Sequence, residues 1–448
     1  MPLFTLLAAG VSLFIFVTGS FARVVGNLLP PEPWTGETLA IDASTKSPKA
    51  IPRAMPTEIL RGVNIGNWLI LEKWMDETNL FVDAFSDAVD QWTFDSIAGA
   101  EEALQKHWAT WFTESDMEAI AAIGMNAIRI PIGYWAFNNT GTPFIKGADV
   151  FLERAIIWAR TYGLKVLIDC HGSPGSQNGF TSSGHEGTVE WQAGNNIQRS
   201  LSVLKTMARK YGSTGYSDVV FGIELVNEPV SDYGNNFSIT KEFARKGYST
   251  VKATASNPEL QIIMHDAFKN PPSYWLSLPS DVSSTNSRQF GIDSHFYQIF
   301  SSVYLSLNVQ SHIAAACNWA SVLAKTKQIM PIYIGEFSAV MNICIDTDHT
   351  SYPGTSCSSA GCQCSSTPID KWNSSLVEVT RRFVEAQLDT FEYNASGWFM
   401  WAWRGPSAWG IKNLIETGVM PNPVTSRKYA NQCTSSIYWT NTTIVDGR

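Results

Sequence analysis

Eight short apolar runs, separated by helix-like segments, constrain the fold of this chain more than any other feature. The runs are Gly62–Trp68, Met125–Pro131, Lys165–His171, Val219–Asn227, Gln261–Asp266, Phe290–Tyr297, Pro331–Glu336 and Gly397–Trp403. Helical periodicity lies between them, for example over Asp149–Tyr162, Ile197–Tyr211 and Leu376–Tyr393. Strands that alternate with helices form a parallel sheet, and eight repeats close most simply into a (β/α)8 barrel. The sequence therefore predicts an α/β fold, a single TIM barrel.

An open, doubly wound sheet is the alternative arrangement of the same elements. It needs a glycine-rich phosphate turn after the first strand, and Gly62-Val63-Asn64-Ile65-Gly66-Asn67 lacks that spacing. A barrel also accounts for most of the 448 residues as one domain, which we place at 58–435. Residues 23–57 are rich in Pro, Ser and Thr and predict an irregular lead-in, and 436–448 form a tail.

The first residues have the character of a targeting signal. Leu3 to Val17 is apolar but short for a membrane span, and Ser20-Phe21-Ala22 fits a small-x-small cleavage site. We therefore expect a secretory signal over 1–22 and no stable membrane span after its removal. An uncleaved anchor is the alternative, because no Lys or Arg precedes the apolar run. Sequons at Asn138, Asn236, Asn373, Asn394 and Asn441 fit a secreted glycoprotein.

The seven cysteines agree with an oxidising compartment. Cys170 lies inside an apolar run and is expected to be a buried free thiol. The other six are Cys317, Cys344, Cys357, Cys362, Cys364 and Cys433, which allow three bridges in 15 connectivities. Four of them fall within the long loop from Asn342 to Asp370, which we interpret as disulfide-tethered. A zinc site at Cys362-Gln363-Cys364 is the competing interpretation, without a second close pair to support it.

Composition excludes some function classes. The net charge of −8 makes a nucleic-acid surface unsuitable, so no nucleic-acid partner is expected. Aromatic residues reach 12% of the chain, with 17 Trp. Such rings serve either as core or as platforms for sugar rings in a cleft.

Six of the eight predicted strands end in polar or aromatic side chains. In a parallel barrel the carboxyl ends of the strands meet at one rim, where catalysis occurs. Any one of these residues has a structural interpretation, but their convergence would place all of them in a single cavity. They are Arg129, His171, Asn227, Glu228, His295, Tyr297, Glu336 and Trp401.

Two of the strand-end residues are glutamates on different strands, which is what glycoside hydrolysis requires. Glu336 would attack the anomeric carbon as the nucleophile, with Arg129 and Tyr297 as donors to its charge. Glu228 would protonate the departing oxygen and later accept a proton from water. Asn227 would hydrogen-bond the 2-hydroxyl of the sugar. This chemistry needs no metal and no cofactor.

Beyond this chemistry, the chain resembles glycoside hydrolase family 5, specifically its fungal exo-β-1,3-glucanase-like branch. The resemblance covers about Arg61 to Cys433. The motifs that carry it are Arg61-Gly62-Val63-Asn64-Ile65-Gly66-Asn67-Trp68 with Glu72, Arg129-Ile130-Pro131-Ile132-Gly133-Tyr134-Trp135, His171-Gly172-Ser173-Pro174-Gly175-Ser176-Gln177-Asn178-Gly179-Phe180, Asn227-Glu228-Pro229, His295-Phe296-Tyr297, Gly335-Glu336-Phe337 and Gly397-Trp398-Phe399-Met400-Trp401-Ala402-Trp403.

The resemblance implies a retaining enzyme with Glu228 as acid/base and Glu336 as nucleophile. It implies that Glu72 binds hydroxyls of the sugar at the cleaved bond, and that Phe180 and Phe300 flank the next sugar. The same subsite would be lined by the other strand-end residues, Arg129, His171, Asn227, His295, Tyr297 and Trp401. The implied substrate is β-glucan, the implied location is extracellular or cell-wall associated, and a monomer is expected.

Departures from the family pattern leave the linkage open. Relatives usually have Gly-Gly-Trp in place of Gly66-Asn67-Trp68, and Asp-Asn-Ser-Gly in place of Thr181-Ser182-Ser183-Gly184. They continue with Trp-Lys-Thr-Glu where this chain has Trp403-Arg404-Gly405-Pro406. We expect an exo-β-1,3-glucanase that releases glucose. The alternatives are an endo-β-1,6-glucanase, a glucan transglycosylase on the same site, and a non-catalytic wall-binding protein, which loss of either glutamate would have favoured.

Overall fold

The computed structural model describes residues 59–231, 233–279 and 287–434, and its centre is a closed barrel of eight parallel strands. The strands are β1 (Leu60–Asn64), β2 (Ala127–Gly133), β3 (Lys165–Gly172), β4 (Val220–Glu224), β5 (Gln261–His265), β6 (Phe290–Phe296), β7 (Ile332–Phe337) and β11 (Gly397–Met400). Each overlaps one of the eight predicted runs, so the (β/α)8 fold is confirmed. The predicted signal at 1–22, the lead-in at 23–57, the tail at 436–448 and the sequon at Asn441 lie outside the described residues.

Consecutive strands pair around the ring until the first meets the last. β1 pairs with β2 on one side and with β11 on the other, where Leu60 is in register with Gly397 and Val63 with Met400. All these pairings are parallel, which leaves no open sheet edge in the barrel.

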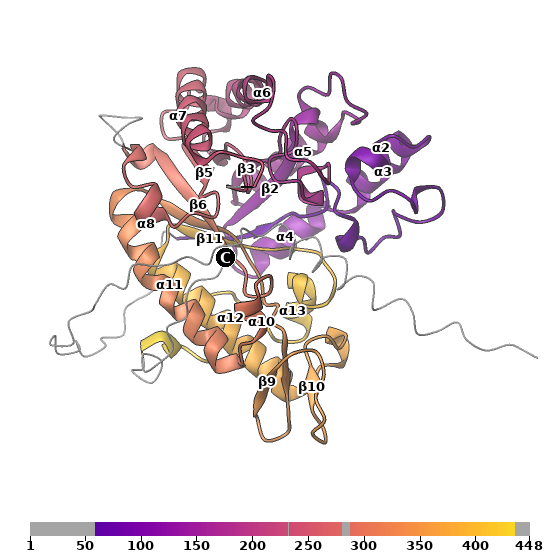
Figure 1. Cartoon of the computed structure of the whole chain (residues 1–448), viewed down its shortest axis with the longest axis vertical. Helices are drawn as coiled ribbons and strands as arrows, with labels where there is room; N and C mark the ends of the chain where they lie inside the picture. Colours follow the sequence, from indigo (N-terminus) through magenta and orange to yellow (C-terminus); the bar gives the residue numbers. More distant parts are fainter. Residues whose placement is uncertain (1–58, 232, 280–286, 435–448) are drawn as a thin grey trace, which may run out of the picture.

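Helices surround the strands (Figure 1), and α11 and α12 pack against each other on one side. The helices are α2 (Gln91–Asp95), α3 (Ala100–Thr110), α4 (Glu114–Ala122), α5 (Ala148–Thr161), α6 (Asn196–Tyr211), α7 (Phe237–Thr254), α8 (Pro271–Tyr274), α10 (Ser302–Leu305), α11 (Val309–Ile329), α12 (Ser374–Asn394) and α13 (Ile411–Glu416). Short 3-10 turns are η1 (Lys73–Met75), η2 (Asp83–Phe85), η3 (Tyr134–Ala136), η4 (Thr181–Ser183), η5 (Thr214–Tyr216), η6 (Ser287–Gln289), η7 (Ile369–Lys371), η8 (Ser407–Trp409) and η9 (Gln432–Thr434).

Local sequence explains why these helices form. In α6, Val203, Leu204, Met207 and Ala208 are buried, and their spacing of three and four residues places one apolar stripe against the barrel. Helix α12 begins after Asn373, whose side-chain oxygen accepts a hydrogen bond from the backbone N–H of Leu376. Such an N-cap stabilises a helix by about 1 kcal/mol. Both helices match predicted segments within two residues.

The barrel interior changes from apolar to charged along its axis. Toward the amino ends of the strands, an apolar cluster closes the barrel, with members Ala127, Leu167, Ile263, Tyr333 and Phe399. Phe221 stacks on Phe399 there, with ring centroids 6.3 Å apart. Above this cluster the interior holds charged and polar side chains, so the groups that could take part in catalysis lie at the carboxyl ends of the strands.

The cysteine interpretation is confirmed, and the structure fixes the pairing. Cys344 pairs with Cys364 and Cys357 with Cys362, so the long loop is tethered as expected and the zinc alternative is wrong. Cys317 pairs with Cys433 and fastens the C-terminal segment to α11. Cys170 is free and buried, and burial raises the pKa of its thiol to about 12.

The tethered loop contains a small antiparallel sheet that the sequence did not predict. Its strands are β8 (Ile343–Ile345), β9 (Ser351–Pro353) and β10 (Gln363–Cys364), with β8 in the middle. Strands of two or three residues are too short to show alternation in a sequence. Figure 1 shows β9 and β10 projecting from one end of the molecule.

A buried carboxylate joins the first barrel strand to the end of the chain. Glu392 of α12 accepts a hydrogen bond from Arg61 Nε at 2.9 Å and lies 3.0 Å from Arg427 Nη2. All three side chains are buried or nearly so. The C-terminal segment is therefore part of the domain fold.

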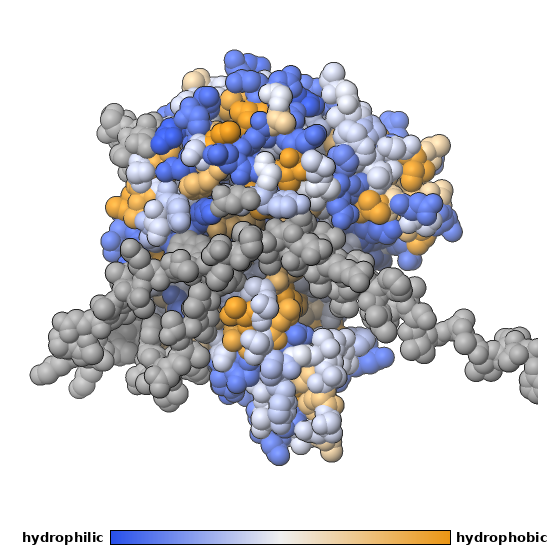
Figure 2. Space-filling model, in the orientation of Figure 1, coloured by the Kyte–Doolittle hydropathy of each residue, from blue (hydrophilic) through white to orange (hydrophobic). Residues whose placement is uncertain are grey.

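The face drawn in Figure 2 is largely hydrophilic where its residues are described. In Figure 2 hydrophobic residues are scattered among hydrophilic ones over the described part of this face. None of the helices within 59–231, 233–279 and 287–434 combines the length and the apolar character that a bilayer span needs.

Candidate active site

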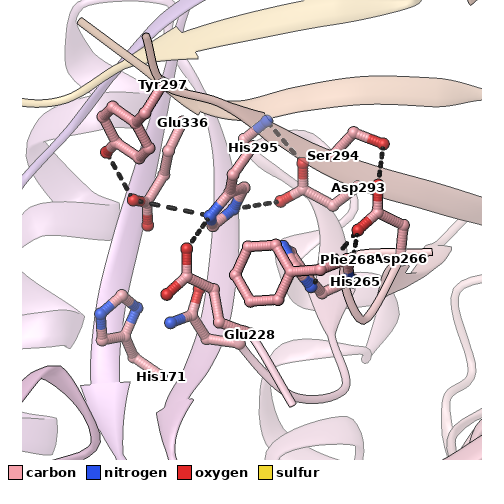
Figure 3. A network of polar contacts seen from close by, with 12 residues as sticks. His171, Glu228, His265, Asp266, Phe268, Asp293, Ser294, His295, Tyr297 and Glu336 are labelled. Carbon is pink, nitrogen blue, oxygen red and sulfur yellow. Dashed lines mark hydrogen bonds and ion pairs between the residues drawn. The ribbon is translucent and has the colours of Figure 1, made fainter. Parts of the chain in front are cut away.

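The structure brings the eight predicted strand-end residues to one end of the barrel. Arg129, His171, His295 and Glu336 lie within β2, β3, β6 and β7, and the others follow the ends of their strands. β4 ends at Glu224, so Asn227 and Glu228 belong to the turn after it. Figure 3 shows His171, Glu228, His295, Tyr297 and Glu336 around one space.

Both donors predicted for Glu336 contact it. Arg129 Nη1 donates a hydrogen bond to Glu336 Oε1 at 2.9 Å, and the Tyr297 hydroxyl donates to Oε2 at 2.7 Å. Burial, together with the charge of Glu336, raises the pKa of Tyr297 well above its usual range, so the phenol stays protonated as a donor. The carboxylate of Glu336 is thus held at both oxygens, by one residue of β2 and by one that follows β6.

His295 lies between the two glutamates (Figure 3). Its Nδ1 is 2.6 Å from Glu228 Oε1 and 3.6 Å from Glu336 Oε2, and its Nε2 is 3.4 Å from Asp293 Oδ2. Burial acts to lower the pKa of His295, but Glu336 and Asp293 outweigh it and raise the pKa well above its ordinary value. The imidazole is therefore a cation that is hydrogen-bonded to Glu228 and forms a longer ion pair with Glu336.

Glu228 has an unusual backbone. Its φ is 45°, in the left-handed region that residues with a Cβ rarely adopt. Such conformations cost about 1–3 kcal/mol and persist where the surroundings impose them, often at functional sites. The turn after β4 thus aims the Glu228 side chain at His295.

A layer of buried charge supports the site from below. Arg129 is fully buried, and its guanidinium lies 3.1 Å from Asp169, 2.9 Å from Glu224 and 3.8 Å from Asp293, in addition to Glu336. Burial raises the pKa of Glu224 well above its ordinary value. Arg129 acts to lower this pKa, but the nearby Asp169 and Asp293 add to the effect of burial. A proton on Glu224 reduces the crowding of negative charge around one arginine.

Asn227 and His171 each offer a buried polar atom to the space above this layer. Arg129 Nη2 donates to Asn227 Oδ1 at 2.8 Å, which turns the Asn227 amide nitrogen the other way. Asp169 Oδ2 lies 2.5 Å from His171 Nδ1, and the Trp401 ring stacks on His171 at 5.7 Å. Asn227 Nδ2 and His171 Nε2 have no hydrogen-bond partner among the described residues. Both atoms can therefore form hydrogen bonds with a ligand that enters this space.

Glu72, which only the family resemblance suggested, also faces this space. Trp74 Nε1 donates to Glu72 Oε2 at 2.9 Å, whereas Oε1 is buried without a partner in the described part of the chain. Burial raises the pKa of Glu72 to about 7, and the charges of His171, Glu336 and Glu228 also act on it. The carboxyl therefore belongs to the same cluster of charged side chains.

Aromatic rings form one wall of the site. Trp409 lies 5.1 Å from Trp74, 5.8 Å from Tyr297 and 6.3 Å from Phe300, measured between ring centroids. The predicted Phe300 is therefore part of this wall, on the loop after β6. The other predicted phenylalanine, Phe180, is half-buried on the loop after β3, at the start of η4.

Sequence reasoning missed the supporting residues Asp169, Glu224 and Asp293 and the rings of Trp74 and Trp409. A signal existed for the three acids, because each is the single acidic residue within an apolar run, and such a charge needs a buried partner. For the two tryptophans the signal was weak, since they lie outside the strands.

The segment after β11 that differs from the family pattern, Trp403 to Pro406, contacts a helix outside the barrel. Trp403 Nε1 donates to Asp116 Oδ1 at 2.9 Å, and Arg404 Nη2 lies 3.3 Å from Asp116 Oδ2. Asp116 belongs to α4, so this loop is anchored to a helix outside the barrel.

Acidic and histidine side chains also gather closely enough to be considered as metal ligands. Glu228, His265 and His295 can bring their ligand atoms within 4.8 Å of one another. Glu228 and His295 are, however, hydrogen-bonded directly, and the raised pKa of His295 keeps it protonated and unable to ligate. The donor set does not fit a metal centre.

Comparisons with known proteins agree with this geometry. The family model described as Cellulase (glycosyl hydrolase family 5) matches residues 87–406. Glucan 1,3-beta-glucosidase 1 of Schizosaccharomyces pombe is 38% identical, over 84% of this chain and 91% of that relative. Glucan 1,3-beta-glucosidase 2 of Wickerhamomyces anomalus is 37% identical, over 84% and 90%. The crystal structure of rutinosidase from Aspergillus niger superposes with a TM-score of 0.61 at 19% identity, over 81% of this chain and 98% of that one, which shows a shared fold.

Proposed function

This chain belongs to glycosyl hydrolase family 5 and is a glycoside hydrolase, and from that premise we propose that it is a secreted, retaining exo-β-1,3-glucanase that releases glucose from β-glucan. The observation that carries the proposal is the sharing of one imidazole nitrogen, His295 Nδ1, by the carboxylates of Glu228 and Glu336. Two carboxylates on different strands around one space are the minimum that the reaction needs.

The separation of the glutamates supports a retaining mechanism. Oxygens that lie 2.6 and 3.6 Å from the same nitrogen are at most about 6.2 Å apart, which is below the roughly 6.5–9.5 Å of inverting enzymes. That spacing favours direct attack by a carboxylate over attack by a water held between the nucleophile and the sugar.

Each glutamate has a role that its surroundings favour. Glu336, held by Arg129 and Tyr297, attacks the anomeric carbon and forms a covalent glycosyl-enzyme. Glu228 protonates the glycosidic oxygen as the bond breaks, and it then removes a proton from the water that hydrolyses the intermediate. His295 donates to Glu228 and so positions its carboxyl oxygen for both proton transfers.

The sugar at the cleaved bond would take up the polar atoms that lack partners. Asn227 Nδ2 donates to its 2-hydroxyl, and His171 Nε2 and Glu72 Oε1 bind other hydroxyls. Trp401 supplies an apolar surface beside His171. Phe180 and Phe300 are proposed to flank the following sugar.

The β-1,3 linkage is proposed from relatives whose names state that activity. The chain departs from the family pattern at Thr181, where relatives carry an Asp, and this favours keeping β-1,6-glucan as the second candidate substrate. Transfer of the glycosyl group to a sugar hydroxyl instead of water uses the same intermediate and remains the third. A wall-binding protein without activity would not need two paired glutamates.

Secretion and the domain limits are part of the proposal. Three disulfides fit an oxidising compartment, and the sequons at Asn138 and Asn236 are exposed. We propose a single catalytic domain over 58–435 that acts as a monomer, behind a signal at 1–22.

Product analysis on laminarin and pustulan tests the proposal. Glucose that appears first from laminarin, and not with Glu336→Ala, is the expected result. The matched control is Glu242→Gln, an exposed glutamate of α7, which should behave as the wild type. An enzyme that is inert on laminarin and releases an oligosaccharide ladder from pustulan would contradict the exo-β-1,3 assignment and support the endo-β-1,6 alternative.

A further inference from the structure

A cavity lies beside the catalytic rim, between the loops that follow β3 and β4. It has a volume of about 420 Å³ and is lined by Gly179, Glu186, Gly187, Thr188, Val189, Tyr233 and Gly234. Gly179 immediately precedes Phe180, and Tyr233 lies five residues after Glu228 on the same loop. A cavity of this volume is within the range of small-ligand sites.

The two loops that form the cavity are locked together. Asn235 Nδ2 donates to Gln177 O at 2.8 Å, and Gln177 Nε2 in turn donates to Asn227 O at 2.9 Å. A Cβ at Gly234 would lie 2.5 Å from the Val189 side chain, and φ there is 72°, so the position requires glycine. The cavity is therefore preformed and is tied through Gln177 to the catalytic Asn227.

The opposite wall is fixed as well. Gly187 N donates to Gly179 O at 3.0 Å, and the backbone N–H of Glu186 donates to Asp90 Oδ2 at 2.7 Å. Asp90 is fully buried and caps α2. A wall held in this way costs little further ordering when a ligand binds.

The lining has the chemistry of a carbohydrate site. Tyr233 presents a large ring with 39% of its surface exposed, and a pyranose can place its C–H face on such a ring. Glu186 and Thr188 also line the cavity, so a carboxyl and a hydroxyl are offered there to sugar hydroxyls. One aromatic face with a few convergent polar groups is what orients a sugar ring.

Position determines which part of a substrate reaches this cavity. Glu228 protonates the departing oxygen in the proposed mechanism, so the leaving portion of the glucan lies on the side of Glu228 and its loop. We propose that the cavity is an outer subsite for the leaving portion, which binds a glucopyranose ring beyond the one at Phe180, with stacking on Tyr233 and hydrogen bonds to Glu186. This inference rests on the proposed function and makes the enzyme selective for chain length.

The test is the dependence of kcat/KM on the length of laminari-oligosaccharides, from disaccharide to hexasaccharide. The wild type should gain at least about tenfold between the two ends of the series, which corresponds to about 1.4 kcal/mol. Tyr233→Ala should lose most of that gain, Tyr233→Phe should keep it, and Glu186→Gln should lose a smaller part. The matched control is Tyr352→Ala, an equally exposed tyrosine on β9, which should keep the wild-type ratio.

The outcomes separate this proposal from the proposed function. A wild type that hydrolyses the disaccharide without a gain from longer chains, or a Tyr233→Ala variant with the full gain, overturns the outer subsite alone. A wild type that cleaves no laminari-oligosaccharide overturns the β-1,3 assignment. The ratio of kcat/KM for hexasaccharide to that for disaccharide, measured on β-1,6-linked oligosaccharides, then decides whether the cavity is an outer subsite. Binding to inactive variants tests the subsite independently of turnover. The ratio of the disaccharide Kd to the hexasaccharide Kd should be smaller for the double variant Glu336→Ala, Tyr233→Ala than for Glu336→Ala alone.

Discussion

Asn67 Oδ1 accepts a hydrogen bond from the backbone N–H of Glu72 at 2.7 Å, while Asn67 itself has a left-handed backbone with a φ of 53°. Its carbonyl oxygen contacts His107 Nε2 at 2.7 Å. Relatives usually have glycine here, which adopts this backbone freely but has no side chain. Asparagine is among the residues with a Cβ that best tolerate it, and its amide adds a contact that positions Glu72.

Two substitutions at Asn67 should separate backbone strain from the lost hydrogen bond. Asn67→Gly keeps the left-handed turn and loses the contact, so we expect a KM raised a few-fold and stability lowered by about 1 kcal/mol. Asn67→Ala loses the contact and adds about 1–2 kcal/mol of backbone strain. Denaturation curves and steady-state kinetics measure both. Equal stability of the two variants would contradict the strain argument.

Glu72 should make stability depend on pH. Burial raises its pKa from 4.5 to about 7, so between these values the folded state holds a proton that the unfolded state has released. The free energy of unfolding should therefore fall as pH rises through this window, by about 3 kcal/mol from this group. Glu72→Gln should remove that part of the slope.

The measurement is urea denaturation at several pH values between 4.5 and 7.5, with two comparison variants. Asp95→Asn removes another buried carboxyl, whose pKa burial also raises to about 7, and should flatten the curve without changing KM. Glu72→Gln should flatten it and raise KM, because only Glu72 faces the substrate. Curves for Glu72→Gln and the wild type that run parallel would refute the assignment.

Loss of the acid should depend on the leaving group. Glu228→Ala should lower kcat/KM on laminari-oligosaccharides about 10²–10⁴-fold, the usual contribution of general acid catalysis. A dinitrophenyl β-glucoside needs little protonation, so its bond should still break quickly and the glycosyl-enzyme should accumulate, with a burst of dinitrophenol. Glu336→Ala should give no burst. A similar loss on both substrates would argue against Glu228 as the acid.

The buried pairing of Glu392 with Arg61 and Arg427 should matter far more than a surface ion pair. Glu392→Ala removes the buried carboxylate that Arg61 and Arg427 share, although Arg427 keeps its contact with Asp389, and should cost about 3–5 kcal/mol. Asp218→Ala removes the partner of Arg160, a 2.6 Å pair that is largely exposed, and should cost about 1 kcal/mol or less. Chemical denaturation of the two variants provides the comparison.

Among the disulfides, Cys317–Cys433 should contribute most to stability. It closes a loop of 116 residues, and the chain-entropy relation assigns about 4–5 kcal/mol to a loop of that length. Cys357–Cys362 spans only 5 residues and should contribute less. Paired Cys→Ser variants, compared by thermal unfolding, test the order. A greater loss from the short bridge would contradict it.

Much of the fold could be predicted because the barrel strands are buried on both faces. Each strand is a nearly continuous apolar run, as Val166-Leu167-Ile168 in β3 illustrates, and the helices between have a clear stripe. The site residues followed from topology, since strand ends converge. By contrast the predicted strand Val219–Asn227 is too long at its end, because β4 ends at Glu224 and the left-handed Glu228 completes the turn.

The remaining features depend on contacts between distant parts of the chain. Nothing near Cys344 in the sequence distinguishes Cys364 from its other partners, and Trp409 reaches Trp74 only because the loops after β1 and β11 are neighbours in the ring. The role of Asn67 required its φ value, which no sequence pattern reports. Such features arise only in the folded chain, where residues distant in sequence come into contact.

The pairing of β1 with β11 also delays closure of the barrel during synthesis. About 340 residues separate Leu60 from its register partner Gly397, and a ribosome that adds 5–20 residues per second needs roughly 17–70 s to cover them. Throughout that interval the growing barrel has two uncovered strand edges that no later element has reached. A nascent chain that stops before Gly397 cannot complete the ring, so truncations there should fail to fold and be degraded by the cell's quality control.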